Sequence, residues 1–188
     1  MKKIAVFASG SGSNFQAIIN EIERGELSAH IALLVCDKSE AKAIERAKTH
    51  EIDTFVFNPK AYASKEEFEQ EIINELQKKD VEFIVLAGYM RLVGTTLLSA
   101  YEGKIVNIHP SLLPSFPGKD AIGQALLAGV KVTGVTIHYV DQGMDTGQII
   151  AQEAVIIDEN ETRETLTTKI QQVEHRLYYK TLKELLSK

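Results

Sequence analysis

Short apolar runs alternate with amphipathic segments along the chain, and this alternation constrains the fold more than any other feature. Residues 3–8 form an apolar run that stops at a cluster of glycine and serine, which is typical of a buried strand. In residues 14–24, phenylalanine and isoleucine recur every three or four positions, as they do on one face of a helix. Strands that alternate with helices form parallel sheets covered on both faces, so we expect a doubly wound α/β fold.

The rest of the chain repeats this pattern. Further strands are expected at residues 31–36, 54–57, 83–86, 105–108, 132–140 and 148–157, and further helices at residues 40–50, 65–79, 121–128 and 162–186. Residues 132–140 alternate between apolar and small or polar side chains, which indicates a half-exposed strand. We therefore predict a mostly parallel sheet of about seven strands in a single domain that spans residues 1–188.

The composition is that of an ordinary globular protein. Hydrophobic residues make up 44% and charged residues 25% of the chain, which excludes the disordered, collagen-like and coiled-coil classes. The formal net charge of −5 disfavours non-specific binding to nucleic acid, and the chain has no basic stripe. No apolar run approaches the roughly 20 residues of a membrane-spanning helix, and no signal-like segment opens the chain. We expect a cytoplasmic protein that binds neither nucleic acid nor membrane.

Neither cysteine nor histidine shows a metal-binding pattern. The single cysteine, Cys36, ends an apolar run, where a small buried side chain is expected, and it cannot form an internal disulfide. The histidines lack the paired spacing of zinc ligands; they are His30, His50, His109, His138 and His175. No metal site is predicted.

The loop at residues 8–14 has features of a phosphate site. Gly10, Gly12 and several serines stand between a strand and a helix N-terminus, where free backbone N–H groups and the helix dipole favour an anion. Phe15 occupies the third glycine position of the dinucleotide motif, and no P-loop lysine follows, so a dinucleotide or a nucleoside triphosphate is disfavoured. The alternative is that the glycines only permit a tight turn. Asn14 suits the helix N-cap.

The densest polar cluster, which begins at Asn107, emerges directly from an apolar strand. Asn107 and His109 are two residues apart, so both side chains point to the same side of that strand. An amide and an imidazole placed in this way can converge on one developing oxyanion, as acyl transfer requires. Taken alone, a histidine at a strand end is more often structural. Covalent catalysis is set aside because no serine lies in a G-x-S-x-G motif.

Asp145 lies in a loop, residues 141–147, whose glycines allow sharp turns. A plain surface turn is one interpretation of this loop. If the loop instead folds over the end of the strand at residues 105–108, the Asp145 carboxylate hydrogen-bonds His109, favours the protonated imidazole and raises its pKa. A charged His109 would then stabilise an oxyanion.

Motifs of a known family occur at residues 8–14, 86–91, 107–114 and 141–147, and the string Asn-x-His-Pro-Ser-Leu-Leu-Pro is the most specific. Through them the chain resembles, over essentially its whole length, the phosphoribosylglycinamide formyltransferases of purine synthesis. The resemblance implies transfer of a formyl group from 10-formyltetrahydrofolate, as co-substrate, to the amine of glycinamide ribonucleotide, without a metal and by a monomer or homodimer. It also implies strand order 3-2-1-4-5-6-7 with the sixth strand antiparallel.

The resemblance also implies roles for individual residues. The catalytic set is Asn107, His109 and Asp145. The residues that bind the ribonucleotide are Gly12, Ser13, Asn14 and Glu174. The residues that bind the folate are Lys65, Met90, Arg91, Leu92, Val93 and Asn107. Many relatives carry histidines after a Pro-Gly pair, whereas this chain continues after Pro117-Gly118 with Lys119-Asp120-Ala121-Ile122-Gly123, so no contacts are implied for that segment.

Other interpretations remain open. Methionyl-tRNA formyltransferases share the folate-binding core but carry a further domain for tRNA, and formyltetrahydrofolate hydrolases carry an N-terminal regulatory domain; neither is expected in a chain of 188 residues. A non-catalytic dinucleotide binder would use Asp37, at the end of the second strand, to hold a ribose, and the missing third glycine counts against it. A purely structural protein would leave Asn107, His109 and Asp145 unexplained.

Overall fold

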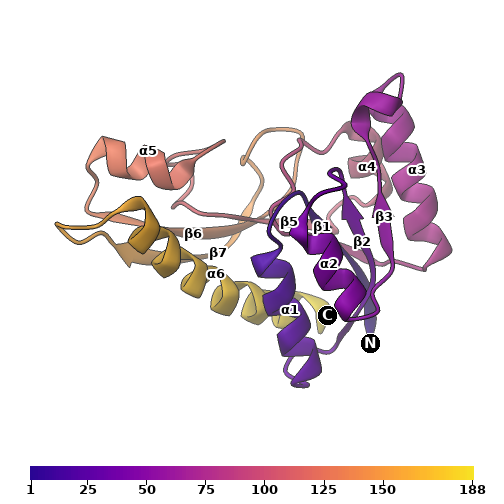
Figure 1. The fold of residues 1–188 in the computed structure, drawn as a ribbon, viewed down its shortest axis with the longest axis horizontal. Helices are drawn as coiled ribbons and strands as arrows, with labels where there is room; N and C mark the ends of the chain where they lie inside the picture. Colours follow the sequence, from indigo (N-terminus) through magenta and orange to yellow (C-terminus); the bar gives the residue numbers. More distant parts are fainter.

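The computed structural model describes residues 1–188 and shows strands alternating with helices (Figure 1). The strands are β1 (Lys2–Ala8), β2 (Ala29–Cys36), β3 (Thr54–Val56), β4 (Phe83–Leu86), β5 (Ile105–His109), β6 (Val132–Tyr139) and β7 (Ile149–Ile156). The helices are α1 (Ser13–Glu23), α2 (Lys42–Thr49), α3 (Lys65–Lys78), α4 (Thr95–Ala100), α5 (Ala121–Ala128) and α6 (Arg163–Leu186), with a 3-10 helix, η1 (Pro59–Ala61).

One mixed sheet organises the molecule. Its seven strands lie in the order β3-β2-β1-β4-β5-β6-β7. The strands from β1 to β5 pair in parallel, β6 is antiparallel to β5, and β7 is antiparallel to β6. The strand order and the antiparallel sixth strand implied by the resemblance are confirmed. From β1 the chain adds strands toward one edge of the sheet, and from β4 it adds them toward the other edge. The loops after these two neighbouring parallel strands therefore diverge, and such a point leaves a crevice for ligands.

Helices cover both faces of this sheet, as the side chains of β1 show. Ile4, Val6 and Ala8 pack in a cluster with α1, α2 and α6, which Figure 1 shows in front of the sheet. Ala5 and Phe7 pack on the opposite face with α3 and α4. Because both faces are covered, the strand has no solvent side, and this explains why its central residues are uniformly apolar. None of the helices has the length and apolar character that crossing a membrane requires.

Most expected elements lie within one or two residues of the observed bounds, and β4 and α5 agree in full. The sequence pattern does not predict α4 or η1, which are too short to show an apolar periodicity. The prediction of a half-exposed strand at residues 132–140 is wrong, since six consecutive residues of β6 are buried. Strands β5 and β7 flank β6, and α6 packs against it, so the half-exposed strand is the edge strand β7.

Candidate active site

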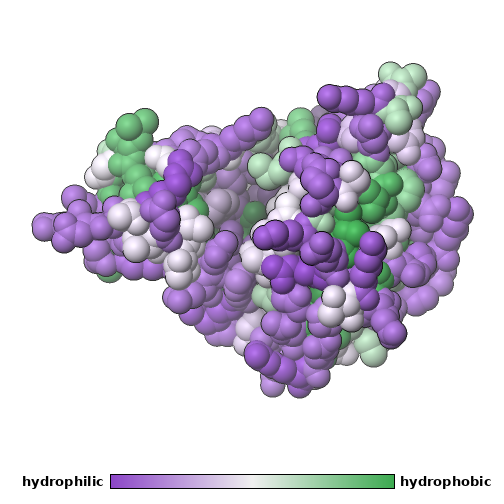
Figure 2. Space-filling model, in the orientation of Figure 1, coloured by the Kyte–Doolittle hydropathy of each residue, from purple (hydrophilic) through white to green (hydrophobic).

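A cavity of about 380 Å³ opens at the carboxyl ends of β4 and β5. Three loops contribute to its wall: residues 88–93 after β4, residues 118–120 before α5, and residues 143–145 between β6 and β7. Figure 2 shows the surface hollowed between the end of the molecule that carries α5 and the body that carries α1 to α3. Segments far apart in the sequence therefore meet around one cavity.

His109 is buried at the end of β5, and both of its ring nitrogens have partners. Its Nε2 lies 2.8 Å from the carbonyl oxygen of Phe116, and its Nδ1 lies 3.5 Å from Oδ2 of Asp145. A carbonyl oxygen only accepts hydrogen bonds, so Nε2 must carry a proton. The Asp145 carboxylate faces the other ring nitrogen, Nδ1, so each nitrogen of the His109 ring lies against an oxygen acceptor.

The loop after β6 turns back over the end of β5 and delivers Asp145. Asp141 shapes the turn, because its Oδ1 accepts hydrogen bonds from the Gly143 N–H at 3.0 Å and the Thr146 hydroxyl at 2.6 Å. The Asp145 side chain is 11% exposed, and its Oδ2 also accepts the N–H of Gly118 at 2.7 Å. The carboxylate is thus held between two loops, and the interpretation of this segment as a plain surface turn is wrong.

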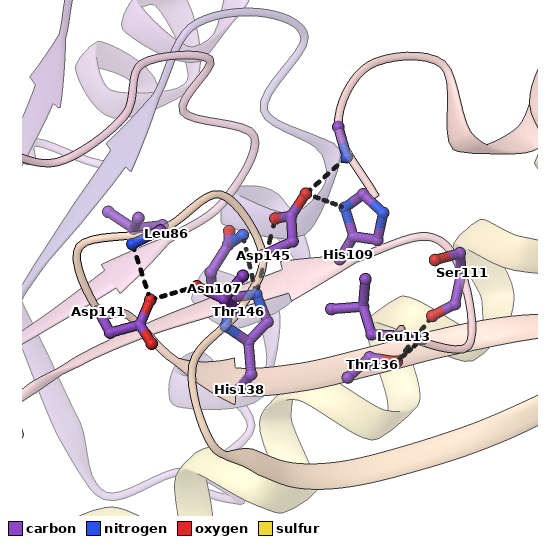
Figure 3. Close-up of polar contacts among 12 residues, drawn as sticks. Leu86, Asn107, His109, Ser111, Leu113, Thr136, His138, Asp141, Asp145 and Thr146 are labelled. Carbon is purple, nitrogen blue, oxygen red and sulfur yellow. Dashed lines mark hydrogen bonds and ion pairs between the residues drawn. The ribbon is translucent and has the colours of Figure 1, made fainter. Parts of the chain in front are cut away.

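Asn107 lies beside His138, a histidine for which the sequence analysis predicts no role. The pairing of β5 with β6 places the two residues opposite each other, with Asn107 Nδ2 3.4 Å from His138 Nε2. His138 Nδ1 donates to the carbonyl of Tyr139 at 2.8 Å, so its Nε2 can accept from the Asn107 amide and orient it. Figure 3 shows Asn107, His138, His109 and Asp145 turned toward one another. The sequence signal for His138 is weak, because Thr133 and Thr136 are also polar and buried in the same strand.

Two of the residues implied in ribonucleotide binding reach the cavity. Asn14 and Glu174 both line it, and Asn14 Nδ2 donates to Glu174 Oε2 at 3.3 Å. Burial raises the pKa of Glu174 to about 7, against the opposing effect of the Asn14 hydrogen bond. The Oδ1 atom of Asn14 is buried without a partner, so it can accept a hydrogen bond from a ligand.

The other two, Gly12 and Ser13, lie at the start of α1 and do not line the cavity. Gly12 is the N-cap, with a φ of 72°, and no side chain caps the helix. The prediction that Asn14 is the N-cap is wrong, because the left-handed Gly12 starts the helix earlier. Helix α2 supports the loop closely: a Cβ on Gly12 would lie 3.0 Å from Ala43, and Arg46 Nε donates to the carbonyl of Ser11 at 2.8 Å.

The loop between β4 and α4 presents apolar side chains at the cavity. Met90 is 61% exposed and Leu92 is 44% exposed, and both line the cavity together with Arg91 and Val93. Lys65 does not reach this cavity. It lines an adjoining pocket that shares part of the same loop and gathers four cationic side chains, Lys38, Lys65, Arg91 and Lys119. Of the residues implied in folate binding, most therefore line the cavity, and Lys65 lines only the adjoining pocket.

The formyl transferase family matches residues 2–182 of the chain. A phosphoribosylglycinamide formyltransferase from Bacillus subtilis is 60% identical over 186 residues, which cover 99% of this chain and 95% of the relative. The chain belongs to the phosphoribosylglycinamide formyltransferase family. It is therefore an enzyme of the formyl transferase class, as its motifs indicate.

Solved structures of family members agree with the fold. The phosphoribosylglycinamide formyltransferase of Bacillus halodurans superposes with a TM-score of 0.97 at 64% identity and covers 100% of this chain and 96% of the other. The glycinamide ribonucleotide transformylase 1 of Geobacillus kaustophilus gives a TM-score of 0.97 at 63% identity, with 99% of both chains covered. The single α/β domain of this formyltransferase, with its mostly parallel sheet, is thus the fold of its family.

In this family member, an ion pair occupies the segment at residues 119–123, for which the sequence implies no contacts. Asp120 caps α5 and pairs with both terminal nitrogens of Arg163, at 2.6 and 2.7 Å, and both residues line the cavity. Gly123 leaves the space for this pair, since a Cβ there would lie 2.2 Å from Asp120 Oδ2. This segment thus contributes a salt bridge to the cavity wall.

The structure contains no group of three or more histidine, cysteine, aspartate or glutamate side chains placed to hold a metal ion. Cys36 is buried at the end of β2, as predicted, and burial is the main cause that raises the pKa of its thiol. A buried, protonated thiol is a poor nucleophile.

Proposed function

We propose that the chain transfers the formyl group of 10-formyltetrahydrofolate to the primary amine of glycinamide ribonucleotide. The products are N-formylglycinamide ribonucleotide and tetrahydrofolate, in de novo purine biosynthesis. Residues 1–188 act as one formyltransferase domain, in the cytoplasm, as a monomer or a homodimer. The observation that carries the proposal is the meeting of Asn107, His109 and Asp145 at one cavity, in a chain 60% identical to the Bacillus subtilis relative.

The neutral amine of the ribonucleotide attacks the formyl carbon. A new carbon–nitrogen bond forms, the formyl oxygen takes up negative charge, and the bond from the formyl carbon to N10 of the folate then breaks. The proton that the amine loses ends on the departing folate nitrogen. Asn107 and protonated His109 stabilise the oxyanion, and one such donor is usually worth roughly 100-fold or more in rate.

His109 acts through the N–H that now faces Phe116. In the reacting complex the formyl oxygen replaces the Phe116 carbonyl as the acceptor of that Nε2–H. Asp145 continues to hold Nδ1 and balances the charge of the ring, so the donor is fixed before the oxyanion forms. The amine proton reaches the folate nitrogen through His109 or through a water held by Asp145.

The ribonucleotide phosphate binds at the N-terminus of α1, against Gly12, Ser13 and Asn14. The backbone N–H groups there have no side-chain cap to compete with an anion, and the helix dipole favours negative charge. Glu174 and the unpartnered Asn14 Oδ1 take hydrogen-bond donors from the remainder of the ribonucleotide.

The folate lies against the loop that follows β4. The exposed side chains of Met90 and Leu92, with Val93 and Arg91 beside them, supply an apolar wall. Lys65, in the adjoining pocket, pairs with negative charge on the folate.

The non-catalytic dinucleotide binder is disfavoured by the surroundings of Asp37. That carboxylate is 2% exposed, and its two oxygens accept hydrogen bonds from Ser9 and Arg91. It is therefore not free to hold a ribose. A hydrolase would use the same three residues, with water in place of the amine as the nucleophile that attacks the formyl carbon. The two activities must therefore be separated by experiment.

Release of tetrahydrofolate from 10-formyltetrahydrofolate is measured with the purified protein, with and without glycinamide ribonucleotide. Release that depends on the ribonucleotide supports transfer. Equal release in its absence indicates a hydrolase. No release under either condition contradicts a catalytic role and favours a binding protein.

A further inference from the structure

Two buried carboxylates lie behind the loop at residues 88–94, and the reaction proposed above uses neither. Asp37 follows β2 and its side chain is 2% exposed, and Glu69 lies on α3 and is 3% exposed as a whole residue. A buried carboxylate is costly unless it is paired or hydrogen-bonded. Both of these groups find their partners in the same loop.

Asp37 holds the first half of the loop through two routes. Its Oδ2 accepts a hydrogen bond from Nε of Arg91 at 2.8 Å, and its Oδ1 accepts the hydroxyl of Ser9 at 2.6 Å. The same Ser9 hydroxyl oxygen accepts the backbone N–H of Met90 at 2.9 Å, and the Ser9 N–H donates to the carbonyl of Gly88 at 3.0 Å. Asp37 thus holds the Arg91 side chain directly and the Met90 backbone through Ser9.

Glu69 holds the other end of the loop. Its Oε2 accepts the backbone N–H of Gly94 at 2.8 Å, where Gly94 is the N-cap of α4. A Cβ on Gly94 would lie 2.5 Å from Oε1 of Glu69, so a larger residue at this position would displace the Glu69 carboxylate. Burial raises the pKa of the Glu69 carboxyl, and the hydrogen bond from the Gly94 N–H opposes this shift.

The two anchor points bracket the side chains that face the cavity. Met90 and Leu92 are large, apolar and exposed, an arrangement that is unfavourable in water unless a ligand covers them. A loop held at both ends keeps these side chains in place without a ligand, and a wall ordered in advance spares the ligand the cost of ordering it.

We propose that Asp37 and Glu69 are positioning residues for the formyl donor, which anchor residues 88–94 as a preformed wall of its binding site. This inference rests on the proposed function, in which that loop contacts the folate. Neither carboxylate touches the reacting atoms. Their loss therefore weakens binding of the donor and leaves binding of the ribonucleotide intact.

The test uses four variants of the full chain. Asp37→Asn leaves one accepting oxygen for two donors, the Arg91 guanidinium and the Ser9 hydroxyl, so one of the two hydrogen bonds is lost. Glu69→Leu removes the acceptor for the Gly94 N–H, and Glu69→Gln keeps it, because an amide oxygen still accepts. Ser9→Ala cuts the link from Asp37 to the Met90 N–H without removing a buried charge, and it replaces Asp37→Asn should that variant not fold.

The Michaelis constants for 10-formyltetrahydrofolate and glycinamide ribonucleotide are measured for each variant, together with kcat. We expect Asp37→Asn and Glu69→Leu to raise the donor constant about tenfold, as a loss of one or two charge-assisted hydrogen bonds does. The ribonucleotide constant should stay within about twofold, and Glu69→Gln should stay close to wild type. The matched controls Asp80→Asn and Glu75→Gln, which remove surface ion pairs with Lys3 and Lys78, should change neither constant.

Three results would overturn the inference. The first is an unchanged Michaelis constant for 10-formyltetrahydrofolate in folded Asp37→Asn and Glu69→Leu, and the second is an equal rise in the Michaelis constants for both substrates. The third is a rise in the constant for 10-formyltetrahydrofolate in Glu69→Gln that is as large as in Glu69→Leu. Calorimetric titration with tetrahydrofolate separates this inference from the proposed function. If wild type binds tetrahydrofolate but does not formylate the ribonucleotide, the proposed function fails and the dissociation constants of the variants still decide the role of the loop anchors. If wild type does not bind tetrahydrofolate, both fail.

Discussion

The carboxylate of Asp145 lies 3.5 Å from Nδ1 of His109, and this contact joins the loop between β6 and β7 to the end of β5. The opposite ring nitrogen of His109 donates to the carbonyl of Phe116, so the ring is held from both sides. The ring is therefore oriented before any substrate binds, as the proposed role of His109 as a hydrogen-bond donor requires.

Replacement of Asp145 tests this contact. Asp145→Asn keeps the shape of the side chain but removes the negative charge beside Nδ1 of His109, and we expect kcat to fall by roughly 100-fold or more. His109→Ala should lower kcat by at least as much. Steady-state turnover measures both, with Asp53→Asn as the control, since Asp53 forms an exposed ion pair with Lys79. Near-normal turnover of folded Asp145→Asn would contradict the assigned role.

Gly12→Ala tests the phosphate loop. The residue has a φ of 72°, and a Cβ would lie 3.0 Å from Ala43, so alanine must displace the loop or α2. We expect a rise of at least tenfold in the Michaelis constant for the ribonucleotide and a loss of about 1–3 kcal/mol in the free energy of unfolding. Gly10→Ala is a matched control, because no atom lies within 4 Å of its added Cβ. Equal effects of the two substitutions would argue against the assignment.

Glu174 gives a prediction about pH. Burial raises its pKa from 4.5 to about 7, so between these values the folded protein holds a proton that the unfolded chain has released. This group therefore makes the free energy of unfolding fall as the pH rises from 4.5 to 7, by about 3 kcal/mol at most, and the loss persists above pH 7.

Glu174→Gln removes this titration. Relative to wild type, the variant should gain about 2–3 kcal/mol in the free energy of unfolding at pH 8 compared with pH 5. Urea unfolding at the two pH values measures the difference. An identical difference between variant and wild type at pH 5 and pH 8 would show that the Glu174 pKa is not raised.

Much of the fold follows from local patterns in the sequence. The apolar runs and helical periodicities predict every strand and all helices except α4 and η1, because each pattern is local to its element. Exposure is harder to predict. The alternation at residues 132–140 indicates a half-exposed strand, yet β6 is buried because β7 extends the sheet beyond it. Which strand forms the edge depends on contacts distant in sequence.

The site shows the same limit. The spacing of Asn107 and His109 predicts that they share a face, but the approach of Asp145 depends on a loop whose fold the sequence leaves open. His138 joins the site through the register of β5 with β6, which no local pattern encodes. The hydrogen bonds of Asp37 and Glu69 to the loop at residues 88–94 likewise become visible only when β2, α3 and that loop are placed together.

The most direct test of the central claim follows the formyl carbon itself. The protein is mixed with 10-formyltetrahydrofolate labelled with carbon-13 in the formyl group and with glycinamide ribonucleotide, and the products are separated and examined by mass spectrometry. We predict that the label appears in the ribonucleotide as an amide-bound formyl group, one for each tetrahydrofolate released. Label recovered as free formate, or retained on the folate, would contradict transfer to the ribonucleotide amine.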